Sequence, residues 1–308
     1  MKGLNEEAIE NLIKAGSIAA DAREYSRTIV RPGEKASIIC AKIEEYIIER
    51  GGEPAFPCNI SIGVVAAHYT PSINDDVEIK EGDVVKIDVG VSIDGYIADT
   101  ATTIDLSGSY VELLEASREA LEAVVGIMKP NIRIYDIGKT IESIVKKKGY
   151  KVIRNLTGHT IDRYMIHAGL SIPNYPDRLT FYKRLTPGMQ VAIEPFTTNG
   201  KGMVIESSTI NIYAYTGKKP RMPLNQAERE MLDYIINKYY TLPFTPRWLV
   251  GRWEAEDVIK IIKSLYMKGV LHGYPVLIES GRGVVAQFEH TFIILKDRVI
   301  VTTCRDCE

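Results

Sequence analysis

The sequence has no apolar run that approaches the roughly 20 residues that a membrane-spanning helix needs. Residues 1–7 also lack the apolar core of a signal peptide. Positive charge is not in excess either, because 38 Lys and Arg residues face 40 Asp and Glu residues, so no global field would draw the chain onto nucleic acid. These absences predict a cytoplasmic protein that engages no membrane and no specific nucleic acid.

Cysteine is scarce, with four residues in a chain of 308. Cys40 and Cys58 lie early in the sequence, whereas Cys304 and Cys307 form a Cys-x-x-Cys pair at its end. Four cysteines with this spacing are no disulfide framework, and a zinc ribbon would need a second pair at matching spacing. The terminal pair is interpreted as a tail without a dedicated role, and a redox or stapling role stays open.

The composition, with 45% hydrophobic and 25% charged residues, is typical of a globular protein with one large domain or two unequal ones. Helical periodicity opens the chain, where Asn5 can cap a helix whose apolar face includes Leu12. A second helical pattern covers residues 36–49 and stops at a Gly-Gly pair, and a strand-like run follows at residues 84–89.

Two parts of the chain resemble each other. Residues 31–51 align with residues 129–149, and residues 82–88 align with residues 188–194, so that both halves read as Pro turn, helix, Gly and strand. A duplicated α+β unit with a pseudo-twofold axis would bring the acidic strand ends, Asp88 and Glu194, to one centre. Chance similarity is the alternative interpretation.

Beyond Gly217 the pattern changes. Residues 225–239 and 254–267 are predicted to be amphipathic helices, with a short strand pair around residues 270–279 and final strands at 284–295 and 299–302. We interpret residues 217–283 as a helical, winged-helix-like insertion into a catalytic domain made of residues 1–216 and 284–308. Acidic residues balance its lysines, which disfavours binding to phosphates and favours a wall of a substrate cleft.

Residues 88–100 are the most informative segment. Asp94-Gly95 between alternating apolar residues predicts a two-residue turn, and the resulting register makes Asp88 and Asp99 diagonal neighbours on one face. Burying the negative charges of two carboxylates costs free energy unless cations neutralise them. Carboxylates with imidazoles suit the divalent ions of manganese, cobalt, iron or zinc. Solvated strand aspartates are the alternative.

Three further residues of the ligand type stand in strand-like surroundings, namely His159, Glu194 and Glu289. Taken singly, each is more readily explained as a structural residue. Together with the two hairpin aspartates they make five side chains of a kind that binds divalent metals.

In order and local sequence, these five motifs resemble the metal-ligand motifs of the methionine aminopeptidases, and the insertion is similar to that of the class II branch, in an archaeal-like chain. The resemblance runs from about residue 5 to residue 303 and implies the pita-bread α+β fold, whose pseudo-symmetry agrees with the duplication. It implies two divalent metal ions, with Asp88 on one ion, Asp99 and Glu289 bridging both, and His159 and Glu194 on the second.

The resemblance also implies the substrate site and the reaction. His68 would lie near the scissile bond and His167 near the substrate carbonyl, while Glu194 would act as general base. The methionine side chain would occupy an apolar pocket of residues that otherwise read as ordinary core, namely Phe56, Ile166 and Phe196. The implied function is removal of the initiator methionine from nascent polypeptides by metal-activated water, by a monomer with transient ribosome association.

Two rival interpretations stay open. Prolidases and aminopeptidases P share the fold and the ligand set but usually carry an added N-terminal domain, for which a first helix at Asn5 would leave no room. Non-catalytic RNA- or ribosome-binding proteins of the same fold typically lose metal ligands. His272 is expected to be structural, and His290, next to Glu289, should point to the opposite face of its strand.

Overall fold

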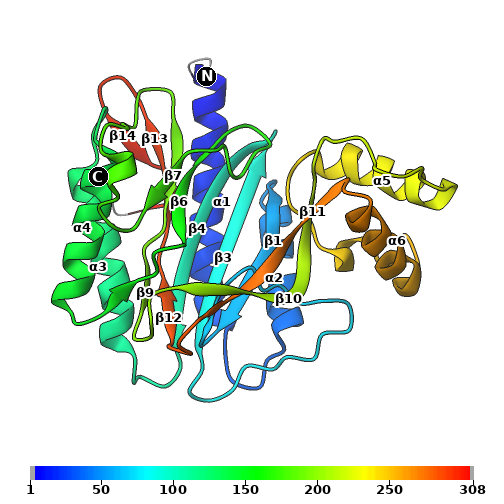
Figure 1. Ribbon diagram of the computed structural model, residues 1–308, viewed down its shortest axis with the longest axis horizontal. Coiled ribbons are helices and arrows are strands. Elements are labelled where there is room, and N and C mark those ends of the chain that lie inside the picture. The colour runs from blue at the N-terminus through cyan, green and yellow to red at the C-terminus, as the bar shows by residue number, and fades with distance from the viewer. Residues whose placement is uncertain (1–3, 306–308) are drawn as a thin grey trace.

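The chain forms two similar α+β halves with helices on their outer faces and a helical projection at one edge (Figure 1). The computed structural model describes residues 4–305. The first half consists of α1 (Glu6–Ile29), α2 (Ala36–Glu49), β1 (Glu53–Ile62), β2 (Val65–Ala67), β3 (Val84–Ile93) and β4 (Tyr96–Asp105).

The second half begins with α3 (Val111–Ile127), α4 (Ile134–Lys147), β5 (Lys151–Val152), β6 (Thr157–Ile161), β7 (Ser171–Pro173), the 3-10 helix η1 (Arg178–Thr180), β8 (Gln190–Ile193) and β9 (Phe196–Thr198). It is completed from the other end of the chain by β12 (Val285–Gln287), β13 (His290–Ile294) and β14 (Val299–Val301). The mixed α+β class is therefore as predicted.

Antiparallel sheet β1-β3-β4 is the centre of the first half, and α1 and α2 pack against it. Asn5 caps α1, because its side chain accepts a hydrogen bond from the backbone N–H of Ala8 at 2.9 Å. Asp94 and Gly95 form the predicted turn with φ of 50° and 82°, and Asp88 pairs with Ala101. The sequence-based prediction of this hairpin and its register is confirmed.

The second half repeats this plan. Its five-stranded sheet has the order β14-β13-β8-β6-β7, and α3 and α4 cover its outer side (Figure 1). Helices α2 and α4 both have 14 residues, and both follow a residue, Lys35 or Arg133, with φ of −77° and ψ of 136°. This repeated conformation supports the duplication inferred from the sequence.

The two halves meet where β4 lies beside β12 and β13, between residues 99–103 and residues 287–291, a junction that we call the seam. Few backbone bonds cross it, such as the one from Glu289 N to Ala101 O at 3.2 Å. Threonine hydroxyls supply most of the others: Thr103 bonds both the N–H and the carbonyl of Gln287, and Thr291 does the same for Asp99. A hydroxyl can donate and accept at once, so each threonine replaces a pair of ladder bonds.

The predicted strand over residues 284–295 proves to be two strands, β12 and β13, interrupted at residues 288 and 289. The cause is a change of partner, since β12 pairs with β9 and β13 pairs with β8 and β14. Glu289 lies in this break, and Glu194 lies in the similar break between β8 and β9.

Residues 216–270 lie between β10 (Val204–Tyr215) and β11 (Leu271–Glu279), and we call this segment the insertion because it makes up most of the predicted one, residues 217–283. It contains α5 (Gln226–Tyr239), the 3-10 helix η2 (Pro246–Leu249) and α6 (Ala255–Met267), which contribute most of a buried apolar cluster that also includes Leu271 of β11. The predicted strand pair around residues 270–279 is wrong: this stretch is the single strand β11, because the long strand β10 and the short β2 provide its partners. The division into a catalytic domain of residues 1–216 and 284–308 and an insertion of residues 217–283 stays a prediction.

A buried ion pair fixes the insertion to the first half. Arg247 and Trp248 of η2 both donate to the carboxylate of Glu44 in α2, at 2.7 Å and 2.9 Å for the Arg247 Nη1 and Trp248 Nε1 bonds to Oε2. The same carboxylate accepts the backbone N–H of Cys58. The insertion is thus held by directional bonds in addition to apolar packing.

No helix among residues 4–305 is long and apolar enough to cross a membrane. Cys40 and Cys58 are buried free thiols. The pair at the end of the chain is not tested, because Cys307 lies outside the described residues.

Glu279 at the end of β11 organises the loops around residues 199–203 and 280–283. Its fully buried carboxylate accepts four backbone N–H groups, those of Lys201, Gly202, Gly281 and Gly283, at 2.5 to 2.9 Å. Burial by itself raises the pKa of Glu279, but the four donors outweigh it and hold the pKa below its ordinary value.

We expect Glu279→Gln to destabilise the fold by about 2 to 3 kcal/mol at pH 7, because an amide cannot accept all four N–H groups. A lowered pKa stabilises the folded state above the unfolded-state pKa of about 4.3, and this contribution is lost as the pH falls through the folded-state pKa. Urea unfolding at several pH values should therefore show the difference between the two proteins shrinking below about pH 4. The control is Glu206→Gln, an exposed residue of the paired strand β10; an equal loss in this variant would contradict the role of Glu279.

Candidate metal centre and substrate cleft

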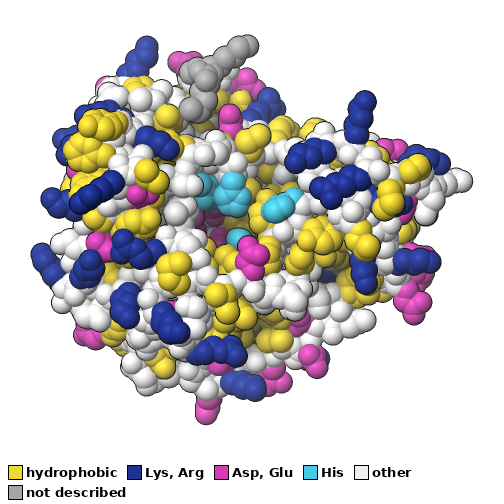
Figure 2. All heavy atoms as spheres, viewed as in Figure 1, with side chains coloured by type: hydrophobic (Ala, Val, Ile, Leu, Met, Phe, Trp, Pro, Cys, Tyr) yellow, Lys and Arg dark blue, Asp and Glu magenta, His cyan; other side chains and the backbone are white. Residues whose placement is uncertain are grey.

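A cavity of about 410 Å³ opens between the two halves, and strands next to the insertion form part of its wall. Figure 2 shows histidine side chains gathered around the hollow at the centre of this face. The cavity is lined by all ten residues that the sequence nominated: Phe56, His68, Asp88, Asp99, His159, Ile166, His167, Glu194, Phe196 and Glu289.

Acidic side chains from different strands converge at the buried end of the cavity. Asp88 on β3 and Asp99 on β4 share the cavity face of the hairpin, and Glu289 reaches it from the break between β12 and β13. Asp99 is 4% exposed and Glu289 is 1% exposed. Asp88 Oδ1, Asp99 Oδ1 and Glu289 Oε1 are buried without a hydrogen-bond partner among the described residues. Such atoms cost free energy unless a cation compensates them.

His159 on β6 completes the cluster. Its Nε2 lies 3.6 Å from Asp99 Oδ2 and 3.6 Å from Glu194 Oε1. Asp99, His159 and Glu289 each offer one ligand atom, and these atoms all lie within 4.8 Å of one another, a spacing that can hold a metal ion. The structure therefore brings the five nominated residues together, and their individual roles stay predictions.

The sequence analysis did not identify Gln287, which joins two of these carboxylates. Its Nε2 donates to Glu194 Oε2 at 3.3 Å and to Glu289 Oε2 at 3.2 Å. The position two residues before Glu289 was a usable signal, because the sequence predicted one strand over residues 284–295, and residues i and i+2 of a strand share a face.

Burial shapes the protonation of the cluster. It raises the pKa of Asp99, Glu194 and Glu289 well above the ordinary range, and repulsion from neighbouring carboxylates raises it further. Burial also raises the pKa of Asp88 to about 7. By contrast, burial and the neighbouring His167 lower the pKa of His159 to about 3, which leaves the imidazole in the neutral form that binds metals.

Two further histidines line the cavity beside the cluster. The ring of His167 lies 4.5 Å from that of His159. His68 has a left-handed backbone with φ of 64°, a strained state for a residue other than glycine. Its Nδ1 lies 3.2 Å from the carbonyl of Pro275, and burial lowers its pKa to about 4.

Tyr274 on β11 lies between these histidines and was not identified from the sequence. Its ring centroid is 5.6 Å from that of His68 and 6.0 Å from that of His167. His272, expected to be structural, lies outside the cavity lining with its ring edge against Tyr274. Tyr274 reaches the cavity only because β11 pairs with β10 and β2, so no local pattern could have revealed it.

Apolar side chains form the rest of the cavity wall. Phe56 and Ile166 belong to one buried cluster and Phe196 to a neighbouring one. Gly90 allows Phe56 to occupy this place, because a Cβ at that position would come within 2.2 Å of its ring. The nominated pocket residues thus lie in one cavity with the carboxylates.

Comparison with known proteins agrees with this picture. The family described as metallopeptidase family M24 matches residues 10–295. The methionine aminopeptidase of Methanocaldococcus jannaschii is 46% identical over 298 residues, which cover 96% of this chain and 99% of that protein. That of Saccharolobus solfataricus is 45% identical over 302 residues, covering 97% and 99%. The chain belongs to metallopeptidase family M24.

Within that family, the predicted resemblance to archaeal methionine aminopeptidases is confirmed. Among solved structures, a thermophilic Arx1 matches with a TM-score of 0.85 at 18% identity, over 97% of this chain and 91% of that one. A methionine aminopeptidase from Thermotoga maritima matches with a TM-score of 0.71 at 23% identity, over 98% and 99%. Together with the family match, these likenesses confirm the pita-bread fold.

The raised carboxylate pKa values predict that metal binding releases protons. At pH 7 the metal-free cluster retains protons that a divalent ion must displace, so Mn²⁺ affinity should fall as the pH is lowered from 8 to 6. Calorimetry in buffers of different ionisation enthalpy should count about one released proton or more.

Asp99→Asn should weaken Mn²⁺ binding at least about 100-fold, whereas Asp94→Asn, an exposed turn residue of the same hairpin, should leave it unchanged. Equal affinity in the two variants would rule out Asp99 as a ligand.

Proposed function

We propose that this chain is a metal-dependent aminopeptidase that removes the N-terminal methionine from new polypeptides. One observation carries the proposal: a single cavity joins a buried carboxylate and imidazole cluster to an apolar pocket. The family match and the named relatives support it. Action in the cytoplasm, as a monomer that meets nascent chains at the ribosome, remains part of the proposal.

The donor set fits two divalent ions. Asp88 would hold one ion, Asp99 and Glu289 would hold both, and the second would be completed by His159 and Glu194. The buried oxygens without partners and the neutral His159 ring support this set. Such ions, when bound, lower the pKa of water and polarise a peptide carbonyl. A mixture of carboxylates and imidazole suits manganese, cobalt, iron or zinc.

Glu194 is the proposed general base. Gln287 donates a hydrogen bond to its Oε2, which fixes the carboxylate beside His159, where it would take a proton from water and pass it to the leaving amine. The carboxylate cluster would also meet the free α-amine of the substrate, which restricts cleavage to the first residue.

The two cavity histidines have different proposed roles. A carbonyl can only accept a hydrogen bond, so the proton of neutral His68 resides on Nδ1, against Pro275, and Nε2 is an acceptor suited to a peptide N–H. Burial lowers the pKa of His167 as well. We therefore assign stabilisation of the developing oxyanion to His167, next to His159.

Chelator-stripped protein supplied with Mn²⁺ should release methionine from Met-Ala-Ser. Norleucine has the shape and apolarity of methionine, so Nle-Ala-Ser should be cleaved within about tenfold of the same kcat/KM. Lys-Ala-Ser should be cleaved at least about 100-fold less efficiently, because the pocket of Phe56, Ile166 and Phe196 gives a buried ammonium no partner. Release is measured by mass spectrometry of the peptides. Preferential cleavage of Ala-Pro-Ser or of Ala-Pro would instead favour the activity of an aminopeptidase P or a prolidase.

A further inference from the structure

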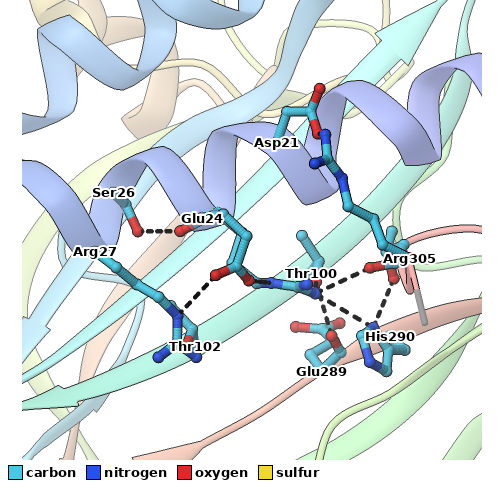
Figure 3. Close-up of polar contacts among 11 residues, drawn as sticks. Asp21, Glu24, Ser26, Arg27, Thr100, Thr102, Glu289, His290 and Arg305 are labelled. Atoms are coloured by element: carbon cyan, nitrogen blue, oxygen red, sulfur yellow. Dashed lines mark hydrogen bonds and ion pairs between the residues drawn. The ribbon is translucent and has the colours of Figure 1, made fainter. Parts of the chain in front are cut away.

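Helix α1 packs against β3 and β4 on the side opposite the cavity, and one of its arginines is buried beside the seam. The side chain of Arg23 is 11% exposed. Successive side chains of a strand point to opposite faces. Therefore Thr100 and His290 face α1, while their neighbours Asp99 and Glu289 face the cavity, and Figure 3 shows Thr100 and His290 gathered beside this helix.

The guanidinium of Arg23 binds three parts of the chain. Its Nη1 donates to Thr100 Oγ1 at 2.7 Å and to the carbonyl of Thr303 at 3.1 Å, and it lies 3.3 Å from His290 Nδ1. His290 Nδ1 also lies 2.9 Å from Thr303 Oγ1. The expectation that His290 points away from Glu289 is thus confirmed, and its partner there is a buried cation.

Two threonines extend these contacts to the backbone of the cluster. Thr100 Oγ1 donates to the carbonyl of Glu289 at 2.7 Å. Thr291, whose N–H donates to Thr303 Oγ1, bonds both the N–H and the carbonyl of Asp99 at 2.8 Å. Arg23 is therefore connected to the backbone of Glu289 through the hydroxyl of Thr100. It is connected to the backbone of Asp99 through Thr303 and Thr291.

The segment that supplies Thr303 is held against α1. Gly16 allows the close approach, since a Cβ there would lie 2.3 Å from the carbonyl oxygen of Thr302. One turn further along the helix, Asp21 pairs with Arg305 (Figure 3). The acceptors around Arg23 thus belong to segments that pack against α1, and the guanidinium links α1 to β4 and β13.

We propose that Arg23 is a positioning residue of the metal centre, which sets the separation of the β4 and β13 backbones at Asp99 and Glu289. The inference rests on the proposed function, because those two carboxylates are the ones that would contact both ions. Without the guanidinium, the seam loses the donor shared by Thr100, His290 and Thr303. Asp99 and Glu289 then no longer lie at the separation that binding to the same ions needs. Metal affinity therefore falls, while the methionine pocket keeps its shape.

Arg27 provides a matched control within the same helix. It lies one turn beyond Arg23 and donates to Thr102 Oγ1 of the same strand, at 2.5 Å. Its side chain is 42% exposed and, like that of Arg23, pairs with Glu24. Among the described residues, however, Thr102 makes no hydrogen bond to β13. Arg27 therefore reproduces the helix-to-strand contact of Arg23 without reaching the seam.

The test is a calorimetric titration of chelator-stripped protein with Mn²⁺ alone, for the wild type, Arg23→Met, Arg23→Lys and Arg27→Met. Arg23→Met should weaken binding about 10- to 100-fold, as loss of an outer hydrogen-bonding partner does in other metal sites. Arg23→Lys should lie between it and the wild type, because an ammonium keeps the charge but not the planar fork. Arg27→Met should stay within about twofold. A folded Arg23→Met protein with the affinity of Arg27→Met would overturn the proposal.

Thr100→Val keeps the inference testable if Arg23→Met does not fold. It removes only the hydroxyl that links Arg23 to Glu289 and should weaken Mn²⁺ binding about tenfold. Combined with Arg23→Lys, it should add little, because both changes break one chain of bonds. Fully additive losses would show that Arg23 acts elsewhere and would overturn the assignment.

Peptide kinetics separate this inference from the proposed function. At saturating Mn²⁺, the Arg23→Lys enzyme should have a lower kcat for Met-Ala-Ser and an unchanged KM. The opposite result, a raised KM with an unchanged kcat, would contradict a role of Arg23 in positioning the metal centre. Wild-type protein that binds Mn²⁺ in an Arg23-dependent manner but releases no methionine would refute the aminopeptidase activity alone. Wild-type protein that binds none of Mn²⁺, Co²⁺, Fe²⁺ and Zn²⁺ would refute both.

Discussion

Mutual repulsion among Asp88, Asp99, Glu194 and Glu289 is the constraint on which the rest of this structure depends. These carboxylates share the buried end of one cavity, where the dielectric constant is low and repulsion is strong. A chain that places them there must either retain protons or bind cations, and the neutral ring of His159 favours cations. The fold must also keep them close without relying on attraction between them.

The seam meets this second demand. The two half-sheets join at β4 and β13 through threonine hydroxyls that bond backbone groups on the opposite strand. Such bonds tie neighbouring strands where a regular ladder is absent, and they leave the cavity-facing positions free for Asp99 and Glu289. Arg23 contacts the seam from the side of α1, which is the side opposite the cavity. The buried anions and a buried cation therefore lie on opposite faces of the same strands.

The proposed substrate side of the cavity depends on the insertion and on β11. Glu44 fixes η2 to the first half through Arg247 and Trp248, and β11 then carries Tyr274 to the cavity between His68 and His167. The carbonyl of Pro275, also on β11, selects the tautomer of His68. The metal side and the substrate side therefore have separate supports, which is why changes at Arg23 and at the apolar pocket should affect different kinetic constants.

The sequence by itself determined the features that depend on close neighbours: the Asp94-Gly95 turn, the pairing of Asp88 with Ala101, the helix over residues 36–49 and the opposite orientations of Glu289 and His290. Resemblance to a family then nominated residues that the structure places in one cavity. Only the tertiary structure decided that β11 pairs with β10, that Gln287 joins two carboxylates and that Arg23 lies behind the seam. The physical reason is that local periodicity specifies which face a side chain occupies, whereas the partner of that face is chosen by pairing between segments far apart in the chain.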